Sequence, residues 1–397
     1  MERMRHAAPE TAPPRRQGED LPPDRKRSLL GDVAGAFGDL GTFLPHVLST
    51  LTVGGLSPAG VLVGFGLFYA ATGALYRLPI PVQPMKAVSA IVATSQPTPG
   101  AVAATGIILG LILLALAFTG LIDRLSRAIP QSVVAGLQLG LGVTLALLGL
   151  RLMMESPALG FGILALVGVL MFVPRCPATL IALVLAVGAG QLFGLAPQPK
   201  AASVHLALPP LTLPTWAEAA DALRDTVLPQ LALTVTNAII VTAALAKTLF
   251  PEAAGRVSER RLSVSSGLAN LLLAPFGALP MCHGAGGLAA HHRFGARTGL
   301  APAILGVLFL VLGLFFAAGA LDLMRLIPVA AVGAFLAVAG ADLAISRRAF
   351  DARPSCWPVI AAAALATLLL NPAVGLLAGF LAELLRAGVL AFLLRRR

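Results

Sequence analysis

The chain has 397 residues, of which 57% are hydrophobic and only 12% are charged, whereas about a quarter of the residues of a water-soluble protein are charged. Its formal net charge of +11 would suit a nucleic-acid-binding protein, but most Arg and Lys lie in short loops or at the termini, where they set the orientation of membrane segments. We therefore expect a chain that lies in the lipid bilayer and binds no nucleic acid.

Apolar runs long enough to cross the hydrocarbon core as helices recur along most of the sequence. The alternation of apolar and polar residues over about ten positions that marks a membrane β-barrel is not seen. The sequence therefore predicts an all-α polytopic membrane protein. The predicted segments are 33–53, 58–76, 101–121, 130–150, 159–173, 178–195, 227–249, 263–278, 301–320, 327–345, 357–371 and 373–394, with two shorter ones, broken by Pro and Gly, at 79–98 and 279–292.

The first 28 residues are polar and rich in Pro and Arg, and they contain no apolar core of a signal peptide. We interpret residues 1–28 as a disordered cytoplasmic tail. A loop at 196–225 then separates two halves of seven elements each, at 29–195 and 226–397. No regulatory domain is expected after the last helix.

The two halves resemble each other in sequence. Pro130 and Pro328 each end a similar tetrapeptide that opens a helix, RAIP at 127–130 and RLIP at 325–328, and Pro84 and Pro280 each lie in a broken segment. The members of these two pairs of prolines are 198 and 196 positions apart. Because seven is an odd number, two such halves must be inverted relative to each other in the membrane, as in many transporters. We expect 14 membrane elements, or 12 if both broken segments are re-entrant.

The positions of the basic residues support this topology. With both termini in the cytoplasm, the outer side carries only Arg151, Lys200, Arg224 and Arg325, which agrees with the excess of positive charge expected on the inside. The predicted location is the inner membrane of a bacterial cell. The inner side carries the tail and Arg77, Arg124, Arg127, Arg175, Arg256, Arg260, Arg261, Arg293, Arg297, Arg347, Arg348, Arg353 and Arg395 to Arg397.

The two broken segments are the candidate binding site. Pro is well suited to the first turn of a helix, so a half-helix can begin near Pro84 in the first segment and near Pro280 in the second. The exposed N–H groups at two facing helix N-termini bind anions. A single break would most simply be a packing kink, but two breaks at equivalent places favour a binding site.

Lys86 lies just inside the first half-helix, where a buried ammonium would bind an anion; the alternative is a lysine that extends to the interface. Gln83 offers neutral donors beside it. Cys282 and His283 occupy the matching turn, and His283 either donates a hydrogen bond, titrates during proton coupling, or is structural. No partner ligands at helical spacing suggest a metal site, and no cofactor is expected.

The first helix of each half should pack beside these breaks. Asp39 lies among apolar residues, so it carries a coupling proton, pairs with Lys86, or caps a helix at the interface. Thr42 of the same helix is a further candidate binding residue. In the second half, Gln230, Thr234 and Asn237 share one helix face, which either lines a cavity or bonds a neighbouring helix.

Four motifs resemble those of a known family: FGDLGT at 37–42, PVQPMKA at 81–87, PMCHGAGGL at 280–288 and RFGARTG at 293–299. They are similar to the signatures of the molybdate transporter family of bacteria and plants, which is related to the SulP sulfate permeases. The similarity runs from about residue 29 to the carboxyl terminus.

The resemblance implies the seven-plus-seven fold of uracil permeases and SulP proteins, with a core domain that moves against a gate domain. It implies molybdate uptake, with a site formed by Gln83, Met85 and Lys86 on one side and by Cys282, His283 and Gly284 on the other. Sulfate is the alternative substrate, and a nucleobase is a weaker one. An enzyme is not expected, because no nucleophile and base are clustered. A second copy of the chain is a further candidate partner.

Overall fold

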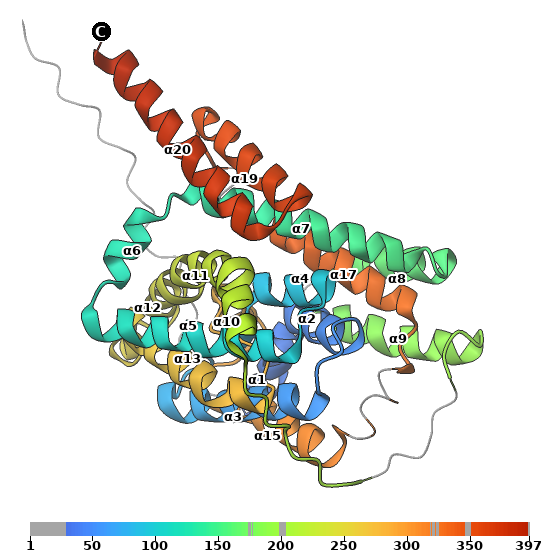
Figure 1. The fold of residues 1–397 in the computed structure, drawn as a ribbon. Helices are drawn as coiled ribbons and strands as arrows, with labels where there is room; N and C mark the ends of the chain where they lie inside the picture. The colour runs from blue at the N-terminus through green and yellow to red at the C-terminus, as the bar shows by residue number, and fades with distance from the viewer. Residues whose placement is uncertain are drawn as a thin grey trace, which may run out of the picture.

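The computed structural model describes residues 29–173, 176, 178–197, 204–317, 319, 322, 325–345 and 351–395. The tail expected at 1–28 lies outside these residues, as do six basic residues of the predicted charge pattern: Arg175, Lys200, Arg347, Arg348, Arg396 and Arg397. The described chain is almost entirely helical (Figure 1).

The first half contains seven membrane elements and one short helix, α6, that the apolar pattern did not predict. These elements are α1 (Leu29–Ala36), which continues through the turn η1 (Phe37–Asp39) into α2 (Leu40–Thr52); α3 (Pro58–Tyr76); strand β1 (Gln83–Pro84) with α4 (Lys86–Ser95); α5 (Pro99–Thr119); α6 (Ile122–Ala128); α7 (Gln131–Met153); α8 (Pro157–Met171); and α9 (Ala178–Leu192).

The described residues of the second half also form seven membrane elements. Its first element is one continuous helix made of α10 (Trp216–Ala222), η2 (Leu223–Val227), α11 (Leu228–Leu233), η3 (Thr234–Val241) and α12 (Thr242–Leu249). The others are η4 (Pro251–Arg256) with α13 (Glu259–Leu273) and η5 (Ala274–Phe276); strand β2 (Met281–Cys282) with α14 (Ala285–Arg293); α15 (Leu300–Phe315); α17 (Val329–Ala344); η6 (Pro354–Cys356) with α19 (Trp357–Leu369); and α20 (Pro372–Arg395).

Helix starts follow local chemistry. Thr98 caps α5 by accepting a hydrogen bond from Ala101 N at 3.1 Å, with Pro99 in the first turn, and Ser57 and Pro58 open α3 in the same way. The loop expected at 196–225 was predicted too long, because α10 begins at Trp216 within it. Thr215 and Glu218 form a reciprocal capping box there, a signal that the sequence already contained.

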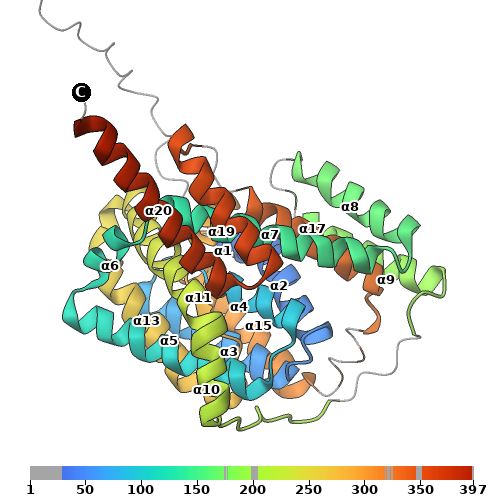
Figure 2. The same cartoon turned by 45° about the horizontal axis from the view of Figure 1, so that its top comes forward.

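The helices form two bodies. The core domain consists of α1 to α5 and α10 to α15, and the gate domain consists of α7 to α9, α17, α19 and α20. The gate helices lie along one side of the core in both views (Figures 1 and 2). The largest hydrophobic cluster belongs almost wholly to the core, and the second is mostly from the gate, with α2, α4 and α11 contributing at the boundary.

Within the gate domain, the inverted repeat is visible in the crossing of α7 and α17. A Cβ at Gly142 would meet the backbone of Gly340 and Ala344, and a Cβ at Gly340 would meet the backbone of Gly142 and Ala146. One contact is converted into the other when Gly142 is replaced by Gly340 and Ala344 by Ala146. Each of these pairs is 198 positions apart, which is also the offset between Pro130 and Pro328. Glycine is needed at both positions because the two helix backbones touch there.

Candidate functional site

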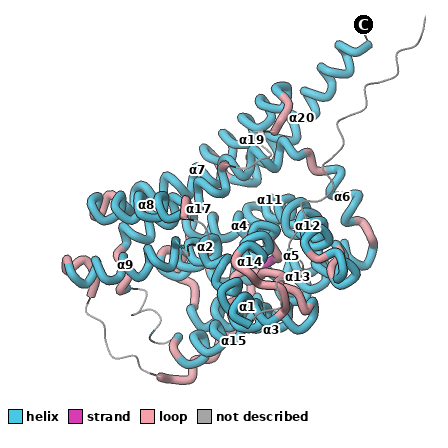
Figure 3. Tube along the Cα trace, turned by 180° about the vertical axis from the view of Figure 1, so that it is seen from behind, coloured by secondary structure: helices cyan, strands magenta, loops and turns pink. Residues whose placement is uncertain are grey.

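The two broken segments meet in the middle of the core domain. Strands β1 and β2 pair antiparallel, with Gln83 opposite Cys282 and Pro84 opposite Met281, and Met85 N donates to Pro280 O at 2.9 Å. Figure 3 shows this strand pair between α14 and α13. The pairing keeps Met281 and Cys282 extended, so α14 begins at Ala285, later than the start near Pro280 that the sequence suggested.

Asn270 of α13 fixes strand β2 in place. Its Nδ2 donates to Met281 O at 2.6 Å, and its Oδ1 accepts from Met281 N at 2.8 Å. The side chain is buried, so both backbone groups of Met281 would otherwise be left unsatisfied. Asn270 therefore acts as a structural clamp on the second break.

The first residues of both half-helices open on one cavity of about 140 Å³. Helix α4 begins at Lys86 and α14 at Ala285, and each is preceded by an extended residue. The cavity thus collects two helix N-termini, which favour negative charge. Its lining residues are Gln83, Pro84, Lys86, Gln138, Gln230, Leu233, Thr234, Asn237, Ala238, Cys282, His283, Gly284, Ala285, Gly286 and Leu343.

Lys86 lines this cavity and forms an ion pair with a residue of the gate domain. Lys86 Nζ lies 3.3 Å from Asp342 Oδ2 of α17, and the two side chains are 33% and 55% exposed. The sequence had suggested Asp39 as a partner for Lys86. Asp342 was missed, although a lone carboxylate in the apolar segment 327–345 is the kind of signal that marks a functional residue in a membrane helix.

Gln230 both lines the cavity and bonds a neighbouring helix. Its Oε1 accepts hydrogen bonds from Ala87 N at 2.9 Å and Val88 N at 3.3 Å, and its Nε2 donates to Thr234 Oγ1 at 2.8 Å. These two N–H groups belong to the first turn of α4, where an anion would bind. A neutral amide oxygen therefore occupies the position that an anion oxygen could take.

Asp39 lies on the opposite side of the same site. Gln83 Nε2 is 2.7 and 2.8 Å from the two Asp39 carboxylate oxygens, and Thr42 Oγ1 donates to Asp39 Oδ1. The carboxylate also approaches the first turn of α14, because a Cβ at Gly287 would collide with Asp39 Oδ2 and Gln83 Nε2. Because residue 287 is glycine, the Asp39 carboxylate can approach the N-terminus of α14.

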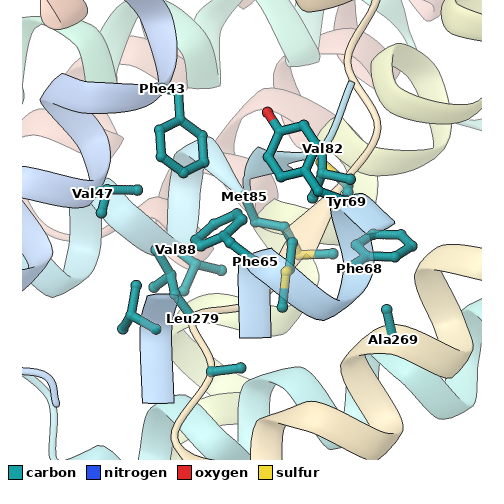
Figure 4. Packing of buried hydrophobic residues seen from close by; sticks show 14 of the residues in the cluster. Phe43, Val47, Phe65, Phe68, Tyr69, Val82, Met85, Val88, Ala269 and Leu279 are labelled. Carbon is teal, nitrogen blue, oxygen red and sulfur yellow. The ribbon is translucent and has the colours of Figure 1, made fainter. Parts of the chain in front are cut away.

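Two predicted binding residues, His283 and Met85, make close contacts within the protein. His283 is fully buried; its Nε2 bonds Ser265 Oγ at 2.8 Å and its Nδ1 bonds Pro81 O at 2.9 Å, so both ring nitrogens have protein partners. Met85 is also fully buried, within the largest hydrophobic cluster, and Figure 4 shows it beside Phe65 and Val82. Of these two residues, only His283 contributes to the cavity wall.

Two larger cavities flank this site between the core and gate domains. One, of about 360 Å³, is lined by Thr42, Arg293, Asp342 and parts of α8 and α9. The other, of about 650 Å³, is lined by residues of α4, α5, α7, α10 and the loop before α20. The charge pattern of the sequence predicts that the first faces the cytoplasm. Thr42 lines this 360 Å³ cavity and contacts Asp39 and Gln83, and it is not among the residues that line the 140 Å³ cavity.

The chain is similar to known transporters over most of its length. The sequence profile of the family described as "Molybdate transporter of MFS superfamily" matches residues 31–145 and 222–343. Molybdate transporter 1 of Arabidopsis thaliana is 32% identical, in an alignment that covers 89% of this chain and 87% of that protein.

Solved anion transporters share the fold. The transmembrane domain of the cyanobacterial bicarbonate transporter BicA matches with a TM-score of 0.64 and 20% identity, over 89% of this chain and 97% of that one. Murine Slc26a9, an anion transporter solved in an inward-facing state, matches with a TM-score of 0.65 and 12% identity, over 93% of this chain and 69% of that one. The predicted seven-plus-seven inverted-repeat fold is confirmed. The major facilitator fold named in the family description has six helices per half, so the description does not fit the observed architecture.

Proposed function

Because this chain belongs to the molybdate transporter family, we propose that it is a secondary transporter that carries molybdate across the cytoplasmic membrane by moving its core domain against its gate domain. Both termini would lie in the cytoplasm, as the distribution of arginines predicts. The observation that carries the proposal is the 140 Å³ cavity, because it gathers two helix N-termini and Lys86 at one place.

The charges around this cavity match a dianion. Each helix N-terminus is equivalent to about half a positive charge, and Lys86 adds one more when it turns from Asp342 to the anion. The pocket would then offer about two positive charges to a tetrahedral oxyanion of charge −2. Asn237, Thr234 and Cys282 line the same cavity and supply neutral donors.

Gln230 would change partners when the anion binds. Its Oε1 holds the N–H groups of Ala87 and Val88 in this structure, and an oxygen of molybdate would accept from the same groups. Rotation of the Gln230 amide would then turn its Nε2 donor toward the anion. The N-terminus of α4 would be satisfied in both states, so binding would not require a buried N–H to lose its partner.

Asp39 is the candidate for proton coupling. An ionised carboxylate near the first turn of α14 offsets the positive end of that helix, whereas a protonated one does not. Protonation of Asp39 would therefore strengthen the site for an anion, and the proton would travel with molybdate. Gln83 and Thr42 both donate hydrogen bonds to the Asp39 carboxylate in the present arrangement.

Uptake of radiolabelled molybdate into a transport-deficient bacterial strain tests the proposal. We expect tungstate to compete and sulfate to compete much more weakly, and we expect uptake to fall when the proton gradient is collapsed. Sulfate that competes as well as molybdate would overturn the substrate assignment in favour of a sulfate transporter. Uptake that persists without a gradient, and that is unchanged in Asp39→Asn, would remove the coupling role of Asp39.

A further inference from the structure

The ion pair between Lys86 and Asp342 joins the two domains at the boundary between two cavities. Lys86 lines the 140 Å³ cavity between the half-helices, whereas Asp342 lines the 360 Å³ cavity beside it. Lys86 belongs to the core domain and Asp342 to the gate domain. Movement of one domain against the other must therefore change the distance between the two charges.

A bound anion and the Asp342 carboxylate compete for the same ammonium group. The pair is 3.3 Å long and both side chains are partly exposed, and such pairs contribute little free energy. A dianion in the cavity can therefore draw Lys86 away from Asp342. When the anion leaves, Asp342 provides the replacement partner and lowers the cost of an unpaired ammonium in the membrane.

The other half of the protein lacks this carboxylate. Residues of α7 and α17 that are 198 positions apart exchange places across the gate domain, so the counterpart of Asp342 is Thr144. Thr144 lines the 650 Å³ cavity on the other side, and its Oγ1 donates to Gly140 O at 2.9 Å. A negative group thus stands at this position on the side of the 360 Å³ cavity, and a neutral one on the side of the 650 Å³ cavity.

We propose that Asp342 is a positioning residue for transport. It competes with the anion for the Lys86 ammonium when the core domain faces the 360 Å³ cavity, and it thereby speeds release of the anion on that side. The proposal rests on the anion site described under Proposed function. It assigns to Asp342 a role that acts through Lys86. The predicted direction of release is toward the cytoplasm, since Arg293 also lines this cavity.

The test compares Asp342→Asn with the wild-type protein, purified at full length. Molybdate binding is measured by titration calorimetry, and uptake by the initial rate at several molybdate concentrations. We expect Asp342→Asn to tighten the molybdate Kd about two- to fivefold, the range expected on removal of a partly exposed competing ion pair. The KM and kcat of uptake should both fall, because release becomes slower. A merely structural role would lower kcat or the yield of folded protein without tightening binding.

Three further variants complete the design. Thr144→Ala is the matched control in the other half, and its Kd should equal that of the wild type. Asp342→Glu retains the charge and should restore a Kd close to the wild-type value. Asp342→Thr, which places the residue of the other half at this position, should behave like Asp342→Asn and replaces it if that variant does not fold.

The outcomes separate this inference from the proposed function. If Asp342→Asn binds molybdate no more tightly than the wild type while Lys86→Ala loses binding, the proposed role of Asp342 is wrong. If Lys86→Ala binds molybdate with the wild-type Kd, the anion site itself is wrong. If Asp342→Asn tightens binding equally in a Lys86→Ala background, Asp342 does not act through Lys86, and the inference fails.

Discussion

The two broken segments have related backbones but different chemistry. Helix α4 begins with Lys86, and its first N–H groups are held by the neutral amide of Gln230. Helix α14 begins in a Gly-rich turn with no cation in its first three residues, and the Asp39 carboxylate approaches it at Gly287. The inverted repeat thus supplies two similar helix N-termini. Lys86 adds a positive charge at the start of α4, whereas the charge at the start of α14 would depend on the protonation of Asp39.

The largest effect is expected at the positive end. Lys86→Ala should reduce molybdate uptake about 10- to 100-fold, because a hydrogen bond to a charged group contributes about 1.5–3 kcal/mol. Uptake of radiolabelled molybdate at equal expression measures the effect. Lys247→Ala is the matched control. Lys247 forms an ion pair with Glu259, at 2.9 Å from Nζ to Oε1, and does not line the cavity. Full uptake by Lys86→Ala would show that α4 does not provide the charge for the anion.

A negative charge at the other break should come next. Cys282→Asp would place a carboxylate in the wall of the cavity and should weaken molybdate binding at least about tenfold, by repulsion at short range in a medium of low dielectric constant. Cys282→Ser, which has nearly the same shape and no charge, should bind within a few-fold of the wild type. Tighter binding by the Asp variant in calorimetry would contradict an anion site between the two helix ends.

Gly287→Ala tests the approach of Asp39 to α14. The added methyl group would collide with the Asp39 carboxylate and the Gln83 amide, and overpacking of this kind costs about 1–3 kcal/mol. We expect uptake to fall about fivefold or more, with a changed dependence on the proton gradient. Gly255→Ala is the control, because nothing lies within 4 Å of a Cβ there and Gly255 is not among the residues that line the 140 Å³ cavity. Equal behaviour of the two variants would remove the special role of Gly287.

The smallest effect on uptake is expected from the clamp on strand β2. Asn270→Ala removes both hydrogen bonds to the backbone of Met281 and should lower the free energy of unfolding by about 1–3 kcal/mol. The melting temperature of the purified protein should fall, while the uptake of correctly folded protein changes little. A melting temperature equal to that of the wild type would mean that strand pairing alone holds the second break.

The sequence alone determined the membrane setting, the two inverted halves and the places of both breaks. These features depend on local properties, namely the length of apolar runs, the position of prolines and the sign of loop charges. The same reasoning predicted most of the polar residues in the cavity wall, including Lys86, Gln230, Asn237 and Cys282, although it missed Gln138. Polar residues are rare in membrane helices and are therefore conspicuous.

The tertiary structure decided which of these polar residues are partners. Asp342 lies 256 positions after Lys86, and no spacing in the sequence could have joined them. The structure also shows contacts that the motifs did not indicate: His283 bonds Ser265 and Pro81, and Met85 packs in the largest hydrophobic cluster. The late start of α14 has the same origin, because the pairing of Met281 and Cys282 with β1 is a contact between halves of the chain. Local composition fixes where a membrane helix can break, whereas the contacts across the inverted repeat fix what each break can bind.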